Sequence, residues 1–282
     1  MSYHRFVAIG DSTTEGLEDP YPPGVHVYEE HGHSLSPSHL NPIGSYRGWS
    51  DRLAVHLAKA QDQALEYANL AIRGYRLHEI RRQLAPALAM RPDIMTIVGG
   101  VNDASKTSWN RHEARGHLAY MFRKARETGA EVLTFTMPDP AAINWMVRPL
   151  RRNILQLNDV TREEAVRYGV RLLDLHRYPV ALDRRMWFED RLHATSLGHR
   201  LIGQALAHIA GVPGIEDPLN QELPALDPVP WRARRREDHY WLREYFIPFV
   251  QRHRRGESMS HGVTPKRPLP TPVSLAEMDL PD

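Results

Sequence analysis

Four short segments of this sequence carry residue types that together could perform acyl transfer. Ser12 stands in Gly10-Asp11-Ser12, directly after an apolar run, so its hydroxyl is expected at the end of a strand where a helix starts. A backbone N–H at a helix start lies in a positive potential that favours a developing oxyanion. The tripeptide alone is a weak signal, because Asp11 or Ser12 could simply cap the helix.

The second segment pairs a carboxylate with a histidine. Asp190 precedes His193 by three residues in Asp190-Arg191-Leu192-His193. With this spacing the carboxylate can accept a hydrogen bond from the imidazole Nδ1–H and leave Nε2 free as a general base. The alternative interpretation is a surface turn that precedes a helix.

The remaining two segments could supply oxyanion donors. Gly74 closes the stretch that begins at Asn69, and Asn102 stands in Gly100-Val101-Asn102-Asp103. A glycine N–H and an asparagine side-chain amide can both donate to an anion. A helix-start turn at Gly74 and an Asx turn at Asn102 are the structural alternatives.

Strands and helices alternate over the first 210 residues. Short apolar runs predict strands at Arg5–Ile9, Leu65–Leu70, Ile94–Val98, Glu131–Thr136 and Val170–Leu175. Amphipathic spacing predicts helices at Trp49–Ala60, Leu77–Met90, His112–Glu127, Leu150–Arg167 and Ser196–Ile209. Such alternation indicates a parallel sheet with helices on both sides, in which ligands bind at the carboxyl ends of the strands.

All four segments therefore converge on one edge of the sheet. They supply a nucleophile, oxyanion donors, a base and a group that orients the base, which are the parts that acyl transfer to water requires. Their coincidence favours catalysis over the separate structural interpretations.

The four segments, in this order, resemble the conserved blocks of the SGNH hydrolases, the GDSL esterase/lipase family. The resemblance covers about residues 4–210. It implies Ser12 as nucleophile, His193 as general base, Asp190 as its partner, and an oxyanion hole made by the Ser12 N–H, the Gly74 N–H and the Asn102 side chain. It also implies a three-layer α/β/α, flavodoxin-like fold with about five parallel strands.

The expected activity is that of a serine hydrolase cleaving carboxylic esters of small or medium acyl groups, with a small-molecule ester as partner and no cofactor or metal. The same site could act as an acyltransferase, a thioesterase or a carbohydrate acetylesterase. A non-catalytic binding module that uses the C-terminal segment is the alternative from another class, and the complete set of catalytic residue types argues against it.

Composition excludes several other classes. The 282 residues contain no cysteine, which excludes a thiol nucleophile and cysteine-ligated metals, and 36 basic against 34 acidic residues give a net charge of +2, so no nucleic-acid binding is expected. Only four basic residues are lysines, a bias that we interpret as base composition. No apolar run is long enough for a transmembrane segment, and the first predicted strand leaves no room for a signal peptide, so a cytoplasmic protein is expected.

Two additions accompany the predicted hydrolase domain, residues 1–210. The insertion 18–45 is rich in histidine and is expected to form a lid over the site. His31 and His33 with Glu29 and Glu30 could ligate a metal, although such loop histidines are usually solvated.

The second addition is the C-terminal extension, residues 211–282, with a basic helix at 231–256 and a proline-rich tail. Residues 231–267 hold ten basic and four acidic side chains, a surplus of six. We expect the helix to dock on the domain, with binding to an anionic membrane or nucleic acid as the alternative, and Pro248 to interrupt it. The tail is expected to be extended or disordered, with possible homo-oligomer formation through the extension.

Some side chains near the predicted site allow two interpretations. Arg73 and Arg76 flank Gly74 and are either solvated or hold an anionic group of the substrate; we favour the former. Four apolar residues either line a substrate pocket or pack in the core: Trp145, Met146, Trp187 and Phe188.

Overall fold

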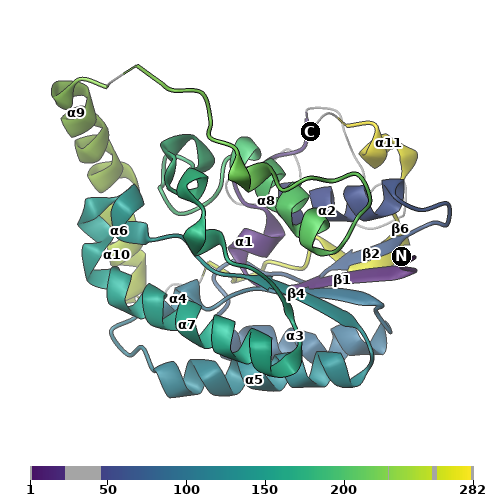
Figure 1. The fold of residues 1–282 in the computed structure, drawn as a ribbon. Coiled ribbons are helices and arrows are strands. Elements are labelled where there is room, and N and C mark those ends of the chain that lie inside the picture. The colour runs from purple at the N-terminus through teal and green to yellow at the C-terminus, as the bar shows by residue number, and fades with distance from the viewer. Residues whose placement is uncertain (1, 23–45, 228, 256–258, 281–282) are drawn as a thin grey trace.

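A six-stranded sheet forms the centre of the molecule. The computed structural model describes residues 2–22, 46–227, 229–255 and 259–280 (Figure 1). The strand order is β5-β4-β3-β1-β2-β6, in which the first five strands are parallel and β6 is antiparallel to β2. The strands are β1 (Arg5–Ile9), β2 (Glu66–Asn69), β3 (Ile94–Ile97), β4 (Glu131–Phe135), β5 (Arg171–Leu173) and β6 (Arg267–Pro272).

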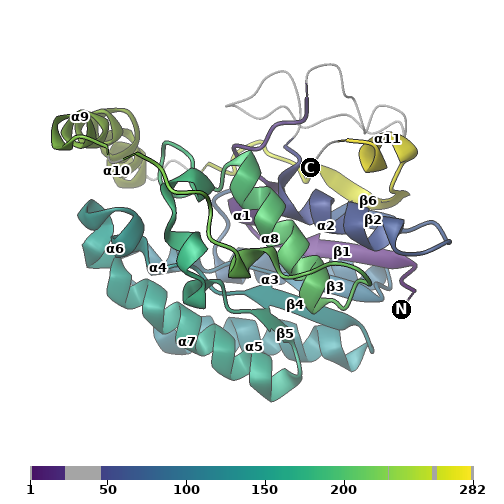
Figure 2. The ribbon, with the colours of Figure 1, turned by 45° about the horizontal axis from the view of Figure 1, so that its top comes forward.

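Helices cover both faces of this sheet, as the alternating sequence predicts. The helices are α1 (Ser12–Glu15), α2 (Gly48–Lys59), α3 (Leu77–Ala89), α4 (Val101–Ala104), α5 (Arg111–Glu127), α6 (Pro140–Ile143), α7 (Arg151–Tyr168), α8 (Ser196–Ile209), α9 (Trp231–Trp241), α10 (Ile247–Arg255) and α11 (Leu275–Met278). Helices α2 and α8 lie on one face, and α3, α5 and α7 on the other (Figures 1 and 2).

Strand β1 shows why both faces are buried. Phe6 and Ala8 belong to the apolar cluster under α2 and α8, whereas Val7 and Ile9 belong to the cluster under α3, α5 and α7. All four side chains are fully buried, because successive residues of a strand point to opposite faces. The prediction of a three-layer α/β/α fold with five parallel strands is confirmed.

The C-terminal extension is partly built into this sheet. Residues 267–272 of the proline-rich tail form β6, which pairs with β2 of the same chain, so this part of the tail is neither disordered nor detached. Prolines at positions 268, 270 and 272 remove N–H groups from one side of the strand only, which an edge strand tolerates.

The predicted interruption of the basic helix takes the form of a π-helical turn. Helix α9 continues through the π-turn Leu242–Phe246 into α10, where Pro248 is the second residue. Because the helix is continuous, Pro248 has no N–H to donate to the preceding turn, and the helix accommodates it directly after the π-turn, where the Ile247 N–H donates to the Leu242 carbonyl. Both ribbon views place α9 and α10 at the end of the molecule that carries α6, opposite the N-terminus (Figures 1 and 2). Within the described ranges no helix has the length and apolar character needed to span a bilayer.

Candidate active site

Ser12, His193 and Asp190 form a continuous chain of hydrogen bonds at the carboxyl ends of the strands. Ser12 Oγ lies 2.9 Å from His193 Nε2, and His193 Nδ1 lies 2.6 Å from Asp190 Oδ2. With the proton on Nδ1, the imidazole donates to the carboxylate, and Nε2 can accept from the serine hydroxyl. The serine and the histidine are each more than nine-tenths buried.

The charges around His193 set its protonation. Burial opposes the charged imidazolium, but the Asp190 carboxylate, with its hydrogen bond and with smaller contributions from Glu18 and Asp11, raises the pKa of His193 above its usual value. Burial likewise tends to raise the pKa of Asp190, and the adjacent imidazole with its hydrogen bonds lowers it. The carboxylate is therefore ionised when the imidazole is needed as a base.

The turn that carries the serine, residues 10–16, is called here the nucleophile turn. Asp11 caps α1 by accepting from the Thr13 N–H at 3.1 Å, so the capping interpretation holds for Asp11 while Ser12 remains free to face His193. Gly16 ends α1 with a φ of 94° and packs against Gly48, where a Cβ would lie only 2.4 Å from the Gly16 Cα. This close approach fixes α1 against the start of α2.

Gly74 and Asn102, which are predicted to hold the oxyanion, lie on segments that contact the nucleophile turn. Gly74 adopts a φ of 79°, which favours glycine, and the hydrogen bonds between described residues use neither its N–H nor that of Ser12. Asn102 Nδ2 donates to the Tyr75 carbonyl at 2.9 Å and makes a longer 3.4 Å contact with Asp11 Oδ2. Burial raises the pKa of Asp11 to about 6.

Arg73 differs from its expected role. The favoured interpretation as a solvated charge is wrong for Arg73, which is 3% exposed and paired with Glu15 of α1, its Nε lying 3.0 Å from Oε1. The Arg73 N–H also donates to Glu15 Oε2 at 2.9 Å. This pair ties the segment that carries Gly74 to the helix that carries Ser12. Arg76, in contrast, is exposed as expected.

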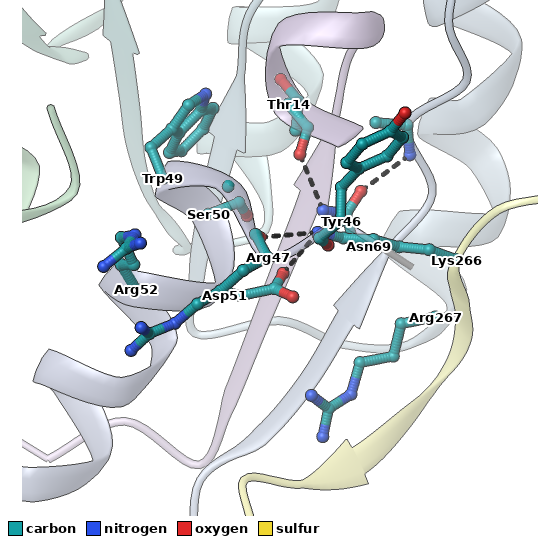
Figure 3. Close-up of polar contacts among 12 residues, drawn as sticks. Thr14, Tyr46, Arg47, Trp49, Ser50, Asp51, Arg52, Asn69, Lys266 and Arg267 are labelled. Atoms are coloured by element: carbon teal, nitrogen blue, oxygen red, sulfur yellow. Dashed lines mark hydrogen bonds and ion pairs between the residues drawn. The ribbon is translucent and has the colours of Figure 1, made fainter. Parts of the chain in front are cut away.

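A buried polar network supports the nucleophile turn from beneath (Figure 3). Asn69 Nδ2 donates to the Thr14 carbonyl at 2.9 Å and to the Tyr67 hydroxyl at 2.9 Å, and that hydroxyl donates to Asp51 at 2.6 Å. Lys266 completes the network from the C-terminal extension, with its Nζ 2.7 Å from Asp51 Oδ1. The network therefore joins β2, α2 and the extension to α1.

The loop that carries the base, residues 189–193, is called here the base loop. The Asp190 carboxylate also accepts from the backbone N–H groups of Leu192 and His193, each at 3.0 Å. Arg191 adopts a left-handed φ of 60°, and the Phe188 N–H closes the loop on the His193 carbonyl at 2.8 Å. Because one carboxylate holds both the imidazole and the loop backbone, the two move together.

The tryptophans proposed to line a substrate pocket lie in different environments in the structure. Trp187 packs against the core beneath α8 and donates from Nε1 to the Ala181 carbonyl at 2.8 Å, which is the core interpretation. Trp145 is 69% exposed and is not part of the core.

Most of the predicted lid, with His31 and His33, lies outside the described residues. Within the described ranges, no group of three or more histidine, aspartate or glutamate side chains is arranged to hold a metal ion.

Sequence reasoning missed three residues that support the site: Glu15, Trp241 and Lys266. Glu15 and Trp241 carry no local signal, since their partners lie 58 and 51 residues away. Lys266 carried a weak local signal, as one of only four lysines in a chain whose other basic residues are arginines. An ammonium suits three separate acceptors better than a planar guanidinium does.

Comparison with known proteins identifies the class. The model of the GDSL-like lipase/acylhydrolase family matches residues 8–201, which include Ser12, Gly74, Asn102, Asp190 and His193. The chain belongs to this family, the SGNH hydrolases, and is an enzyme of the esterase and lipase class.

Solved structures share its fold. They include LAE5, an α/β hydrolase from the Lake Arreo metagenome (20% identity, TM-score 0.58), and a lipase/acylhydrolase from Enterococcus faecalis (21%, 0.55), each match covering 75% of this chain and 96% of the other. The acetyl xylan esterase Axe2 from Geobacillus stearothermophilus, as a W215I variant, matches with the same coverage (16%, 0.57). A search of curated proteins found no match.

Proposed function

We propose that the protein hydrolyses carboxylic esters of small or medium acyl groups through an acyl-enzyme on Ser12. The observation that carries this proposal is the continuous chain of contacts from Ser12 Oγ through the imidazole of His193 to the Asp190 carboxylate. This arrangement activates a hydroxyl as a nucleophile.

In the first step Ser12 Oγ attacks the ester carbonyl carbon while its proton passes to His193 Nε2. The carbonyl π electrons move to the oxygen, and Asp190 stabilises the imidazolium that forms. When the tetrahedral intermediate collapses, the bond to the alcohol breaks, and the alcohol oxygen takes the proton from Nε2. The products of this step are the free alcohol and an ester on Ser12.

The developing oxyanion is held by three donors: the Ser12 N–H, the Gly74 N–H and the Asn102 side-chain amide. Neither backbone N–H donates a hydrogen bond to a described residue. The contact of the Asn102 amide with Asp11 is 3.4 Å long, so one amide hydrogen is held only weakly. One such donor contributes roughly 3–4 kcal/mol to transition-state stabilisation.

In the second step a water molecule attacks the acyl carbon of the Ser12 ester. His193 Nε2 removes the water proton and then returns it to Ser12 Oγ as the intermediate collapses. The carboxylic acid leaves and the serine hydroxyl is restored. The role of His193 as a base requires its neutral form, so activity should rise as the pH passes the raised pKa of this histidine.

The same chemistry accepts other acyl donors and acceptors. Because an acetyl xylan esterase shares the fold, acetylated sugars belong in the substrate panel beside simple esters and thioesters. An alcohol that replaces water in the second step would make the enzyme an acyltransferase.

The test compares wild-type protein with Ser12→Ala on p-nitrophenyl esters from acetyl to lauroyl and on acetylated xylo-oligosaccharides. We expect Ser12→Ala to lower kcat/KM by about 10⁵-fold or more on the best substrate. The control is Ser108→Ala, which removes an exposed serine hydroxyl and should retain wild-type rates. Equal activity of wild type and Ser12→Ala, or none in either across the panel, would contradict the proposal.

A further inference from the structure

The C-terminal extension lies outside the matched family region, yet it contacts the base loop directly. Trp241, the last residue of α9, donates from its indole Nε1 to the backbone carbonyl of Asp190 at 2.8 Å. The Trp241 side chain is 5% exposed, although most of α9 is exposed. Because the buried indole N–H of Trp241 needs an acceptor, its hydrogen bond to the Asp190 carbonyl fixes the peptide group between Asp190 and Arg191.

The neighbouring residues of the loop make parallel contacts with the same segment. Arg191 forms an ion pair with Asp238 at 2.7 Å, and its guanidinium lies 5.4 Å from the centre of the Trp241 ring. Glu189 accepts from the Tyr245 hydroxyl at 3.1 Å. Three successive loop residues, 189–191, therefore each contact a different residue of α9 or the π-turn.

The extension also reaches the oxyanion side of the site. A Cβ placed on Gly74 would lie 3.3 Å from the Met259 Cβ, and Lys266 is bound beneath the nucleophile turn. The extension is thus attached both to the base loop and to the body of the enzyme. A short loop with one left-handed residue and no strand or helix of its own gains its rigidity from such attachments.

We propose that α9 and the π-turn hold the base loop in its catalytic geometry, with Trp241 as a positioning residue for Asp190 and His193. This inference rests on the proposed ester hydrolysis. The physical link is the Asp190 residue itself: its carbonyl is bound to Trp241, and its carboxylate binds His193. A displacement at the carbonyl therefore moves the base relative to Ser12.

The first test is kinetic and uses the full-length chain. Trp241→Phe keeps an aromatic ring and removes the donor, and we expect kcat to fall by about three- to tenfold, the value of one hydrogen bond. Trp241→Ala removes both, and we expect a loss of about 10²-fold, typical of a small misplacement of a catalytic group. In both variants KM should change little. Trp231→Phe and Trp231→Ala are the matched controls, because Trp231 begins the same helix and is 62% exposed.

The second test requires no substrate. NMR titration of the His193 imidazole should show a lower pKa in Trp241→Ala than in wild type, because a displaced carboxylate stabilises the imidazolium less; the Trp231 variants should not change it. If Trp241→Ala does not fold, the same titration on Trp241→Phe and on Asp238→Asn, which breaks the Arg191 ion pair, replaces it.

The outcomes separate this inference from the proposed function. A wild-type kcat and an unchanged His193 titration in the Trp241 variants, even with a lower Tm, would overturn the inference and leave ester hydrolysis intact. A shifted titration in a protein that cleaves no ester would support positioning by Trp241 and overturn the proposed reaction.

Discussion

Ser12 and His193 are 181 residues apart in the chain and are held by two different kinds of structure. The nucleophile turn follows a central strand and is fixed by buried contacts to α2, β2 and the segment before Gly74. The base loop follows a series of 3-10 turns, among them Arg184–Met186, and its residues 189–191 are held by the C-terminal extension. The nucleophile turn and the elements that fix it, here the nucleophile half, are held mainly by the family's core, with Lys266 as the contribution of the extension. The base loop and the elements that fix it, here the base half, are held in our proposal by the extension, which is an addition to that core.

The Glu15–Arg73 pair is the first place to test this difference. Glu15→Gln leaves the Arg73 guanidinium buried without its counter-charge, and we expect the free energy of unfolding to fall by roughly 3–5 kcal/mol, measured by urea denaturation. This pair is one of the buried contacts that fix the nucleophile turn to the body of the protein, so the cost should be global.

The matched control is Glu66→Gln, whose partner Arg5 lies on the adjacent strand. That pair is about one-third exposed on both sides, so its loss should cost less than about 1 kcal/mol. A double variant with methionine at both 15 and 73 should recover stability relative to Glu15→Gln, because neither charge of this pair is then buried without its partner. Equal losses in Glu15→Gln and Glu66→Gln would show that the buried pair does not fix the nucleophile half.

The two halves also differ in how far the sequence predicts them. The strands and Ser12 follow from local patterns: an apolar run places the serine, and five runs alternate with amphipathic helices. The Asp190-x-x-His193 spacing likewise predicts a pair that contacts within one loop, as it does. These features depend on neighbours in the chain, which hydrophobic periodicity and short motifs record.

The supports of both halves could not be predicted in this way. Arg73 and Glu15 are distant in sequence, and a charge beside a glycine suggests solvent exposure unless the partner is known. The strand 267–272 was hidden by its prolines, which are rare in strands except at an edge. Trp241 lies in a helix whose composition indicates a solvated surface. In each case the residue is stabilised by a contact with a distant part of the chain, and patterns in a single sequence do not identify that partner.

Lys266 sharpens the comparison, because it belongs to the extension but contacts the nucleophile half. Lys266 is 5% exposed, and its ammonium donates to the Tyr46 and Arg47 carbonyls at 2.9 Å each and to Asp51 at 2.7 Å, which uses all three hydrogens. We expect Lys266→Arg to lower the free energy of unfolding by about 1–3 kcal/mol, since a larger planar group overpacks this site.

Lys124→Arg is the control for this substitution. Lys124 lies on α5 with its side chain 38% exposed and pairs with Glu127, so exchange of the cation should change stability by no more than about 0.5 kcal/mol. If Lys266→Arg behaves like Lys124→Arg in urea denaturation, the choice of lysine at 266 has no structural cause.

Besides His193, the described residue His199 also joins the two halves, and acid should therefore weaken their connection. It lies on α8, just after the base loop, and is 1% exposed. Its Nδ1 accepts from the Trp49 N–H of α2 at 3.1 Å, and its Nε2–H donates to the Leu17 carbonyl after the nucleophile turn at 3.0 Å. This pattern requires the neutral imidazole, and burial lowers the pKa of His199 to about 4.

The sign of the pH effect follows from this shift. Between pH 6.5 and 4 the unfolded chain binds a proton at this histidine and the folded chain does not, so the stabilisation is complete above about pH 6.5 and is lost as the pH falls toward 4. We expect this group to lower the free energy of unfolding by about 1–2 kcal/mol at pH 5 relative to pH 7.5.

The measurement is urea denaturation of wild type and of His199→Asn, which offers a donor and an acceptor but does not titrate. Because His193 and the other carboxylates titrate in both proteins, the difference between the two pH profiles reports His199 together with Asp19, the carboxylate that interacts with it. Parallel profiles would mean that the hydrogen bonds of His199 to Trp49 and Leu17 do not depend on a neutral imidazole. A wild-type stability that falls more steeply toward pH 5 would assign part of the acid sensitivity to these contacts between α8, α2 and the nucleophile turn.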